Sequence, residues 1–350
     1  MTNPVSRILI VQTAFIGDVI LTLPLLQTLK KYYPWATIDF LCIPSTRNVL
    51  ETHEGLGNLI VYDKHQKESG FLSLHKLILS LSQSKYDVAI VPHRSFRSAY
   101  LVWRAGIPIR VGFDTSAGKY FFNRRIEYQK KLHEIDRNIR LLEALNIRTS
   151  EKVFPKISFT EEDHTIVNTW FKAFGIDPDS KLIAIAPGSV WATKRWLPEH
   201  YVQTVKELSN HSYKTVLIGG KQDQEIGNFI EESVAGELAN AIGKFTLRQS
   251  ALILKKCQLL IANDSAPQHL AVSVKTPVIT VYGPTVPEFG FFPYGANDKV
   301  VESKNLSCRP CSIHGGPKCP IGTFECMKNI HPNEVLKAVY QILDLMAVKE

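Results

Sequence analysis

Residues 259–270 of this chain have the sequence LLIANDSAPQHL, in which a polar turn follows an apolar run. The first four residues match a strand that is buried in a parallel sheet. Asn263, Asp264 and Ser265 then offer side chains that favour the start of a helix, where backbone N–H groups are free. The stretch therefore predicts either an anion site after a strand or an ordinary strand-to-helix connection without a ligand.

Short apolar runs alternate with helical patterns along nearly the whole chain. In the first half, strands are expected at residues 7–11, 37–42, 58–62, 87–91 and 110–113. In the second half, strands are expected at residues 182–186, 215–218, 238–241, 259–262 and 277–282. This alternation predicts an α/β fold with two Rossmann-like parallel sheets, each covered by helices on both faces.

The chain has 350 residues, which suits two domains of ordinary size. The alternation breaks at residues 149–158, which include Pro155. We therefore expect an N-terminal domain at 1–155, a second domain at 156–330 and a final helix within 331–350. Because ligands of such sheets collect at the carboxyl ends of the strands, two facing halves predict a cleft between the domains.

The net charge of +8 lies entirely in the first half, because residues 1–155 hold 21 basic and 13 acidic side chains. Such a balance suits nucleic acid, an anionic membrane surface or a polyanionic substrate, or it is a solvated surface without a partner. No nucleic-acid-binding module is recognisable, which disfavours the first of these partners. The apolar runs are too short to cross a bilayer and the N-terminus is a poor signal peptide, so we expect a cytoplasmic protein.

Asp18 follows the first predicted strand at the edge of the sheet where ligands bind. A carboxylate there can remove a proton from a hydroxyl group, or it can simply cap the next helix. Gly17 stands alone and not within a Gly-x-Gly-x-x-Gly sequence, which argues against a nicotinamide dehydrogenase.

A second polar loop, APGSVWATKRWLPE at residues 186–199, also joins a predicted strand to a predicted helix. Ser189 and Thr193 can donate hydrogen bonds, and Lys194 supplies a charge that suits a diphosphate. The loop lacks the P-loop spacing, so ATP hydrolysis is not indicated, and a solvated surface loop is the alternative. His269 follows Ser265 by about one helical turn, so the two side chains are expected to share a face.

Four of the six cysteines, Cys308, Cys311, Cys319 and Cys326, lie close together near the end of the chain. The first pair has the C-x-x-C spacing of a zinc site, whereas six residues separate the second pair. The sequence leaves a zinc site open as the minor interpretation, and a stable disulfide is not expected in reducing cytoplasm.

In their order and spacing these motifs resemble the ADP-heptose:lipopolysaccharide heptosyltransferases of glycosyltransferase family 9, heptosyltransferase II in particular. The resemblance extends over almost the whole chain. The matching motifs are GD and LP at residues 17–18 and 23–24, PGS and KRW at 187–189 and 194–196, NDSA at 263–266, and VYGPT at 281–285. The chain departs from many relatives at Ala266, where they carry glycine.

The resemblance implies a GT-B fold, with the last helix packing back on the N-terminal domain, and an inverting reaction that needs no metal and no cofactor. Asp18 would be the general base. Eight residues would bind the nucleotide sugar: Ser189, Thr193, Lys194, Glu225, Asp264, Ser265, Ala266 and His269. Five residues would bind the acceptor: Arg94, Arg97, Arg124, Arg125 and His133.

The implied donor is ADP-heptose, and the implied acceptor is acidic Kdo-lipid A or a heptosyl core. The chain would then work as a monomer at the cytoplasmic face of the inner membrane, in peripheral contact with its anionic lipids, and without nucleic acid. Two alternatives remain open. One is a transferase of the same fold that uses another nucleotide sugar, and the other is a non-catalytic protein that binds polyanions.

Overall fold

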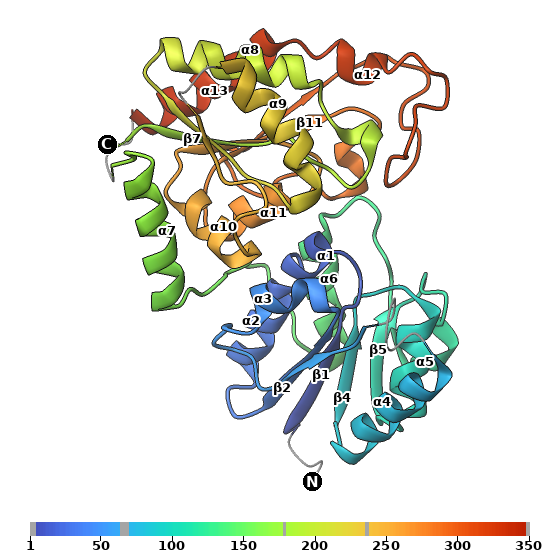
Figure 1. Cartoon of the computed structure of the whole chain (residues 1–350). Coiled ribbons are helices and arrows are strands. Elements are labelled where there is room, and N and C mark those ends of the chain that lie inside the picture. The colour runs from blue at the N-terminus through green and yellow to red at the C-terminus, as the bar shows by residue number, and fades with distance from the viewer. Residues whose placement is uncertain (1–4, 64–69, 178–179, 235–237, 348–350) are drawn as a thin grey trace. The chain divides into compact units, whose positions relative to one another are not determined.

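The computed structural model describes residues 5–63, 70–177, 180–234 and 238–347. The chain forms two compact units, Met1–Ser158 and Phe159–Glu350. Each unit contains one six-stranded parallel sheet with helices packed on it (Figure 1). The predicted α/β architecture with two Rossmann-like sheets is therefore confirmed.

The sheet of the first unit has the strand order β3-β2-β1-β4-β5-β6. Strands are added on one side of β1 up to β3 and then on its other side from β4 onward, so the strand order reverses between β1 and β4. Side chains that follow these two strands lie at the place where parallel sheets bind ligands. The strands are β1 (Arg7–Val11), β2 (Thr37–Cys42), β3 (Leu59–Val61), β4 (Val88–Val91), β5 (Ile109–Phe113) and β6 (Arg124–Ile126). The helices are α1 (Ile16–Ile20), α2 (Leu23–Tyr32), α3 (Arg47–Leu50), α4 (Phe71–Gln83), α5 (Phe96–Arg104) and α6 (Glu134–Arg140).

The sheet of the second unit has the strand order β12-β11-β10-β7-β8-β9, with the same reversal between β7 and β10. Ala262 of β10 lies between Ala186 of β7 and Thr280 of β11. The strands are β7 (Leu182–Ala186), β8 (Lys214–Leu217), β9 (Leu238–Asn240), β10 (Leu259–Asn263), β11 (Val278–Tyr282) and β12 (Lys299–Glu302). The helices are α7 (Glu161–Ala173), α8 (Pro198–Asn210), α9 (Gln224–Val234), α10 (Leu247–Lys255), α11 (Ala266–Ser273), α12 (Glu325–Lys328) and α13 (Pro332–Ala347).

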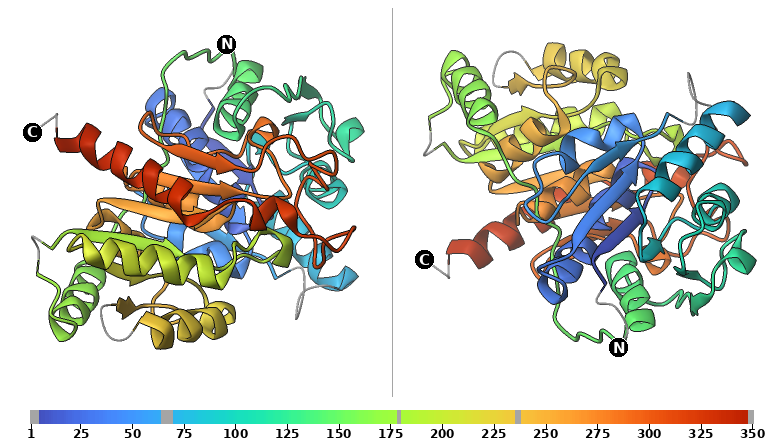
Figure 2. Two further views of the ribbon diagram at one scale, coloured as in Figure 1. Left: turned by 90° about the horizontal axis from the view of Figure 1, so that it is seen from above. Right: turned by 90° about the horizontal axis from the view of Figure 1, so that it is seen from below.

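The last helix, α13, packs against α8, β11 and β12 of the second unit (Figures 1 and 2). Val335, Val339 and Ile342 are buried in the core of that unit together with strand residues of the sheet. The helix thus packs within the second unit, Phe159–Glu350. The predicted domain bounds at 1–155, 156–330 and 331–350 stay predictions. The predicted packing of this helix on the N-terminal domain stays a prediction.

Two short strands, β6 and β12, were not predicted. Both lie at a sheet edge, and their sequences RRI and KVVE lack the apolar run of a buried strand. Two helices, α1 and α2, follow β1, and Pro24 lies in the first turn of α2, where its missing N–H costs nothing. None of the helices within the described ranges combines the length and the apolarity that crossing a membrane requires.

Trp196 joins the loop at residues 186–199, which follows β7, to the last helices of the second unit. It is fully buried, its indole Nε1 donates to the carbonyl oxygen of Ile330 at 2.9 Å, and its ring lies against Tyr201. We predict that Trp196→Ala lowers the free energy of unfolding by about 3–5 kcal/mol, because a large buried ring is lost. Guanidinium titration followed by circular dichroism measures this change. The matched control Trp35→Ala, at a ring that is 63% exposed, should stay within about 0.5 kcal/mol; equal small losses would contradict the packing.

Candidate functional site

The carboxyl end of β10 carries a fully buried amide, that of Asn263. Its Oδ1 accepts hydrogen bonds from the backbone N of Trp196 and from the hydroxyl of Tyr201, each at 3.0 Å. Its Nδ2 donates to the carbonyl oxygen of Pro187 at 2.8 Å. Asn263 therefore fixes the loop after β7 against the end of β10, a role that the sequence analysis did not assign to it.

Lys194 and Asp264 form a mostly buried ion pair at this edge of the sheet, with 2.6 Å between Nζ and Oδ2. The same Oδ2 accepts from the hydroxyl of Thr285 at 2.7 Å, and Oδ1 accepts from Nε2 of Gln268 at 3.1 Å. Asp264 thus keeps the ammonium group of Lys194 in place without freedom to swing into solvent. Two residues of the predicted donor set meet here, and Thr285 and Gln268 support them.

His269 lies in α11, close enough to the Lys194–Asp264 pair for the charges of both residues to act on its imidazole. The side chain is buried, and burial lowers its pKa to about 4 although the carboxylate of Asp264 opposes the change. The imidazole is therefore neutral near pH 7, where it can donate or accept one hydrogen bond without adding charge.

Two of the remaining predicted donor residues, Ser265 and Thr193, have hydroxyl groups that contact the protein backbone. Ser265 precedes α11, but its hydroxyl does not cap the helix and lies 3.4 Å from the carbonyl oxygen of Gly188. Ala266 and Pro267 begin the helix, and the proline removes one of the free N–H groups that an anion would use. Thr193 uses its hydroxyl to hold Gly316, accepting from its N at 2.8 Å and donating to its O at 2.9 Å.

Ser189 is buried within the same loop. Its predicted contact with a nucleotide sugar, like that of Ser265, Ala266 and Thr193, stays a prediction.

Two acidic residues follow β8, and they differ in environment. Glu225, the predicted ligand residue, is exposed in the first turn of α9. Asp223 is buried, which raises its pKa, and its Oδ2 accepts from the backbone N of Gly220 at 2.9 Å. A Cβ on Gly188 would stand 2.2 Å from the carboxylate of Asp223, so only glycine permits this close approach. Asp223, not Glu225, is therefore the carboxylate that touches the loop after β7.

In the first unit, Asp18 lies in the first turn of α1, directly after β1. Its Oδ2 accepts from the backbone N of Phe15 at 3.2 Å, so the predicted capping role is present. The side chain is only half-buried, and its role as a general base stays a prediction.

A charged cluster around Tyr128, of which the sequence predicted only Arg94, lies close enough to Asp18 for the charge of Asp18 to act on Glu134. Two guanidinium groups lie near the ring of Tyr128, whose centroid is 4.2 Å from Cζ of Arg94 and 4.7 Å from Cζ of Arg137. Glu134 is buried, with Oε2 at 3.0 Å from Nε of Arg137 and 3.3 Å from the Tyr128 hydroxyl. Burial raises the pKa of Glu134 to about 7; Arg137 opposes this shift and the charge of Asp18 adds to it.

The other predicted acceptor residues are placed differently. All four predicted arginines are exposed, but only Arg94 belongs to the Tyr128 cluster, whereas Arg97 lies on α5 and Arg124 and Arg125 on β6. His133 is buried and caps α6, since its Nδ1 accepts from the backbone N of Ile135 at 3.2 Å. The i, i+3 spacing of Glu134 and Arg137 on a helix was the one signal that could have found the cluster.

The four cysteines near the C-terminus are free thiols. Cys326 is buried, and burial raises its pKa to about 11, which disfavours the thiolate form that binds metals. Among the residues with a described position, no three His, Cys, Asp or Glu side chains are arranged to hold a metal ion.

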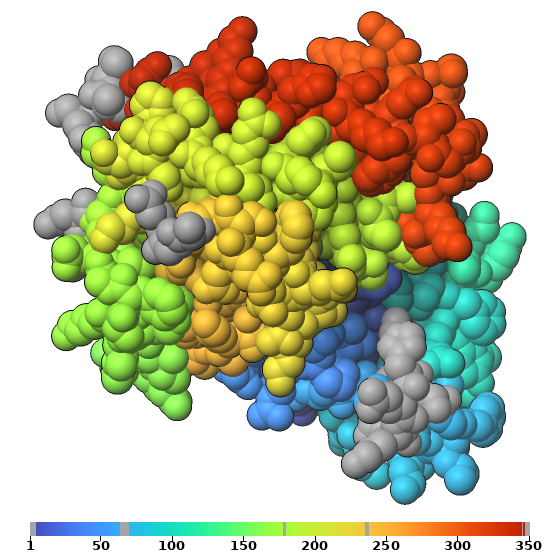
Figure 3. Space-filling view, turned by 45° about the horizontal axis from the view of Figure 1, so that its top comes forward, coloured from blue at the N-terminus to red at the C-terminus, as the bar shows by residue number. Residues whose placement is uncertain are grey.

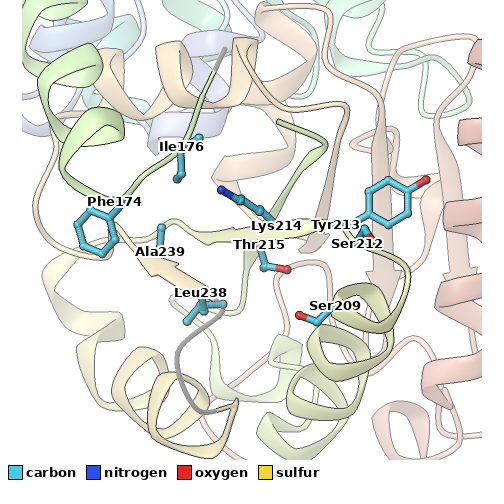
Figure 4. Close-up of a pocket in the computed structure, with 9 residues that line it drawn as sticks. All are labelled: Phe174, Ile176, Ser209, Ser212, Tyr213, Lys214, Thr215, Leu238 and Ala239. Atoms are coloured by element: carbon cyan, nitrogen blue, oxygen red, sulfur yellow. The ribbon is translucent and has the colours of Figure 1, made fainter. Parts of the chain in front are cut away.

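A hollow of about 440 Å³ lies elsewhere in the second unit (Figure 4). It is lined at the amino ends of β8 and β9 by Lys214, Thr215, Leu238 and Ala239. Because parallel strands present their carboxyl ends at the opposite edge, this hollow is separate from the Lys194–Asp264 site.

The sequence model of glycosyltransferase family 9 (heptosyltransferase) matches residues 74–317, more than half of the chain. The chain belongs to glycosyltransferase family 9. The resemblance of the motifs to this family is therefore confirmed, and the chain is an enzyme of the transferase class.

Two curated relatives of this glycosyltransferase are named as lipopolysaccharide heptosyltransferases. Lipopolysaccharide heptosyltransferase 2 of Escherichia coli K12 is 28% identical over 306 residues, which cover 81% of this chain and 84% of the relative. The protein of the same name from Salmonella typhimurium is 27% identical over the same shares of both chains.

Two solved structures confirm the predicted GT-B fold. A family 9 glycosyltransferase from Veillonella parvula superimposes with a TM-score of 0.88 at 28% identity, covering 98% of this chain and 99% of the other. The ADP-heptose lps heptosyltransferase II of E. coli superimposes with a TM-score of 0.78 at 25% identity, covering 97% and 99% of the two chains.

The raised pKa of Glu134 predicts a pH dependence of stability. A carboxyl group whose pKa is about 7 when folded and 4.5 when unfolded stabilises the fold fully below pH 4.5, and this contribution is lost as the pH rises through 7. Between about pH 5 and pH 7.5 the wild type should lose on the order of 2 kcal/mol of unfolding free energy because Glu134 ionises. We predict that Glu134→Gln does not show this loss. Urea titrations at both pH values measure it, with Glu127→Gln as an exposed control. Identical pH slopes for wild type and Glu134→Gln would refute the assignment.

Proposed function

We propose that this glycosyltransferase moves a heptose from ADP-heptose to the acidic inner core of lipopolysaccharide, with inversion at the anomeric carbon and without a metal ion. The observation that carries the proposal is the buried Lys194–Asp264 pair at the carboxyl edge of β10. It holds a lysine ammonium group, paired with a carboxylate, at the edge where sugar diphosphates bind in folds of this type. The relatives named as lipopolysaccharide heptosyltransferases support the choice of sugar and acceptor.

The second unit is assigned the departing ADP. As the bond between the anomeric carbon and the phosphate oxygen breaks, negative charge grows on the diphosphate. The ammonium of Lys194 and the N–H groups at the start of α11 can stabilise that charge, because Asp264 and Thr285 hold the lysine ready before the reaction begins. His269, neutral near pH 7, can donate one hydrogen bond to the same oxygens.

The first unit is assigned the acceptor. The acceptor hydroxyl attacks the anomeric carbon from the face opposite to ADP, and its proton passes to the carboxylate of Asp18. A single displacement of this kind inverts the anomeric centre. The exposed guanidinium group of Arg94 suits the carboxylates and phosphates of an acidic acceptor, whereas Arg137 is buried and paired with Glu134.

The proposed acceptor is Kdo-lipid A or a heptosyl core, both of which are attached to lipid. The chain would therefore act at the cytoplasmic face of the inner membrane, with ADP-heptose supplied from solution, and we propose that it does so as a monomer. The basic excess of the first half supports contact with an anionic membrane.

The general base is tested by Asp18→Asn. We expect kcat to fall by about 10²–10⁴-fold, because the amide cannot accept the proton, whereas the Kd for ADP changes little. Release of ADP from ADP-heptose in the presence of the acceptor measures turnover, with EDTA present to show that no metal is needed. Asp136→Asn, at a carboxylate of α6, is the matched control and should keep the wild-type rate. Wild-type turnover by Asp18→Asn would remove Asp18 from the mechanism.

A further inference from the structure

An aromatic face forms on the outer side of α5. Phe96, Tyr100 and Trp103 follow one another at intervals of four and three residues, so they share one side of the helix. The ring of Phe121, from the 3₁₀ helix η2 (Lys119–Phe121), lies 4.9 Å from Trp103 and 5.7 Å from Tyr100 between ring centroids. Phe96 is 55% exposed and Trp103 42%, so water covers much of this face.

Tyr120, which precedes Phe121 in η2, is 82% exposed. We call Phe96, Tyr100, Trp103, Tyr120 and Phe121 together the aromatic face. Tyr100 and Phe121 also rest on the buried core, which holds the other rings in place. A rigid group of exposed aromatic rings is uncommon on a soluble surface and marks an interaction site.

Helix α4 adds further exposed apolar side chains beside this face. It packs against α5, and both helices cover the side of the first sheet that carries Leu9, Val11 and Val91. The outer sides of the two helices therefore point away from the sheet together. Leu72 is 78% exposed and Leu79 48%, one helical repeat of seven residues apart (Figure 3 shows α4 in light blue at the surface).

The segment that contains the aromatic face is strongly basic. The segment 94–131 contains nine lysines and arginines against two acidic residues, so it holds a net charge of +7 out of the +8 of the whole chain. Arg104 lies 5.8 Å from the ring centroid of Trp103, and Lys119 lies 5.5 Å from that of Tyr120. Two of the positive charges thus lie beside exposed rings of this face.

We propose that the aromatic face and the outer side of α4 dock on the surface of an anionic lipid bilayer. Exposed Trp, Tyr and Leu side chains enter the headgroup region, while the flanking Arg and Lys side chains pair with lipid phosphates. The charge selects this occupant, because a second copy of the same basic face would be repelled. The inference rests on the proposed lipid-linked acceptor only for its purpose, since the surface itself is defined by the side chains named above.

Vesicle sedimentation with the full chain tests the proposal. Wild type should bind phosphatidylcholine vesicles with about 30 mol% phosphatidylglycerol at least about tenfold more strongly than pure phosphatidylcholine, and about 0.5 M salt should remove most of the difference. The pair Trp103→Ser with Tyr120→Ser, and separately Arg104→Glu with Lys119→Glu, should each weaken binding about tenfold. The matched control, Trp35→Ser with Lys206→Glu, changes an exposed ring and an exposed charge elsewhere and should bind like wild type.

Tryptophan fluorescence provides a second readout that does not depend on how much protein sediments. Lipids brominated near the headgroup should quench part of the emission of wild type and of Trp35→Phe, but not that of Trp103→Phe. Equal binding of wild type and both substituted pairs, or quenching that survives in Trp103→Phe, would overturn the proposal. Absence of vesicle binding by wild type would overturn it as well.

Transfer assays keep this inference separate from the proposed function. The substituted pairs should retain the wild-type kcat on a deacylated, water-soluble acceptor and show a raised KM only for the acceptor embedded in vesicles. A kcat that falls on the soluble acceptor would show a structural role for this face. If wild type transfers no heptose to either acceptor, the proposed function fails while the vesicle measurements still decide the docking surface.

Discussion

The buried amide of Asn263 is the constraint on which the candidate donor site depends. Because the side chain is removed from water, its oxygen and nitrogen must find partners within the protein. They find them in Pro187, Trp196 and Tyr201, which lie between 62 and 76 residues away along the chain. These bonds fix the loop after β7 at one position on the end of β10, and that position brings Lys194 to Asp264.

The two units treat charge differently. In the second unit a single ion pair is buried and is hydrogen-bonded by neutral groups, which is the arrangement that lets a buried charge persist. In the first unit several charged side chains lie around Tyr128, and burial raises the pKa of the Glu134 carboxyl group. A lysine held in place by its carboxylate partner suits a departing diphosphate, whereas the exposed guanidinium group of Arg94 suits an acidic acceptor.

Much of this arrangement follows from local sequence. Apolar runs between polar turns predicted all but two of the strands, and the motifs around Asp18, Lys194 and Asp264 predicted the edges of the sheets at which these residues lie. Partnerships across long stretches of chain could not be predicted. Nothing near Asn263 indicates that it binds Trp196, and nothing near Thr193 indicates that its hydroxyl holds Gly316. The Tyr128 cluster could not be predicted for the same reason, because Arg94 lies 34 residues from Tyr128 along the chain.

The most direct test of the account is the shift in melting temperature that nucleotide sugars cause in the full chain. ADP-heptose at about 100 times its Kd should add about 3 kcal/mol to the stability of the folded state and raise the melting temperature, whereas UDP-glucose and GDP-mannose should not. Lys194→Ala should show a smaller shift with ADP-heptose at the same concentration. No shift with ADP-heptose, or an equal shift with all three nucleotide sugars, would contradict the account.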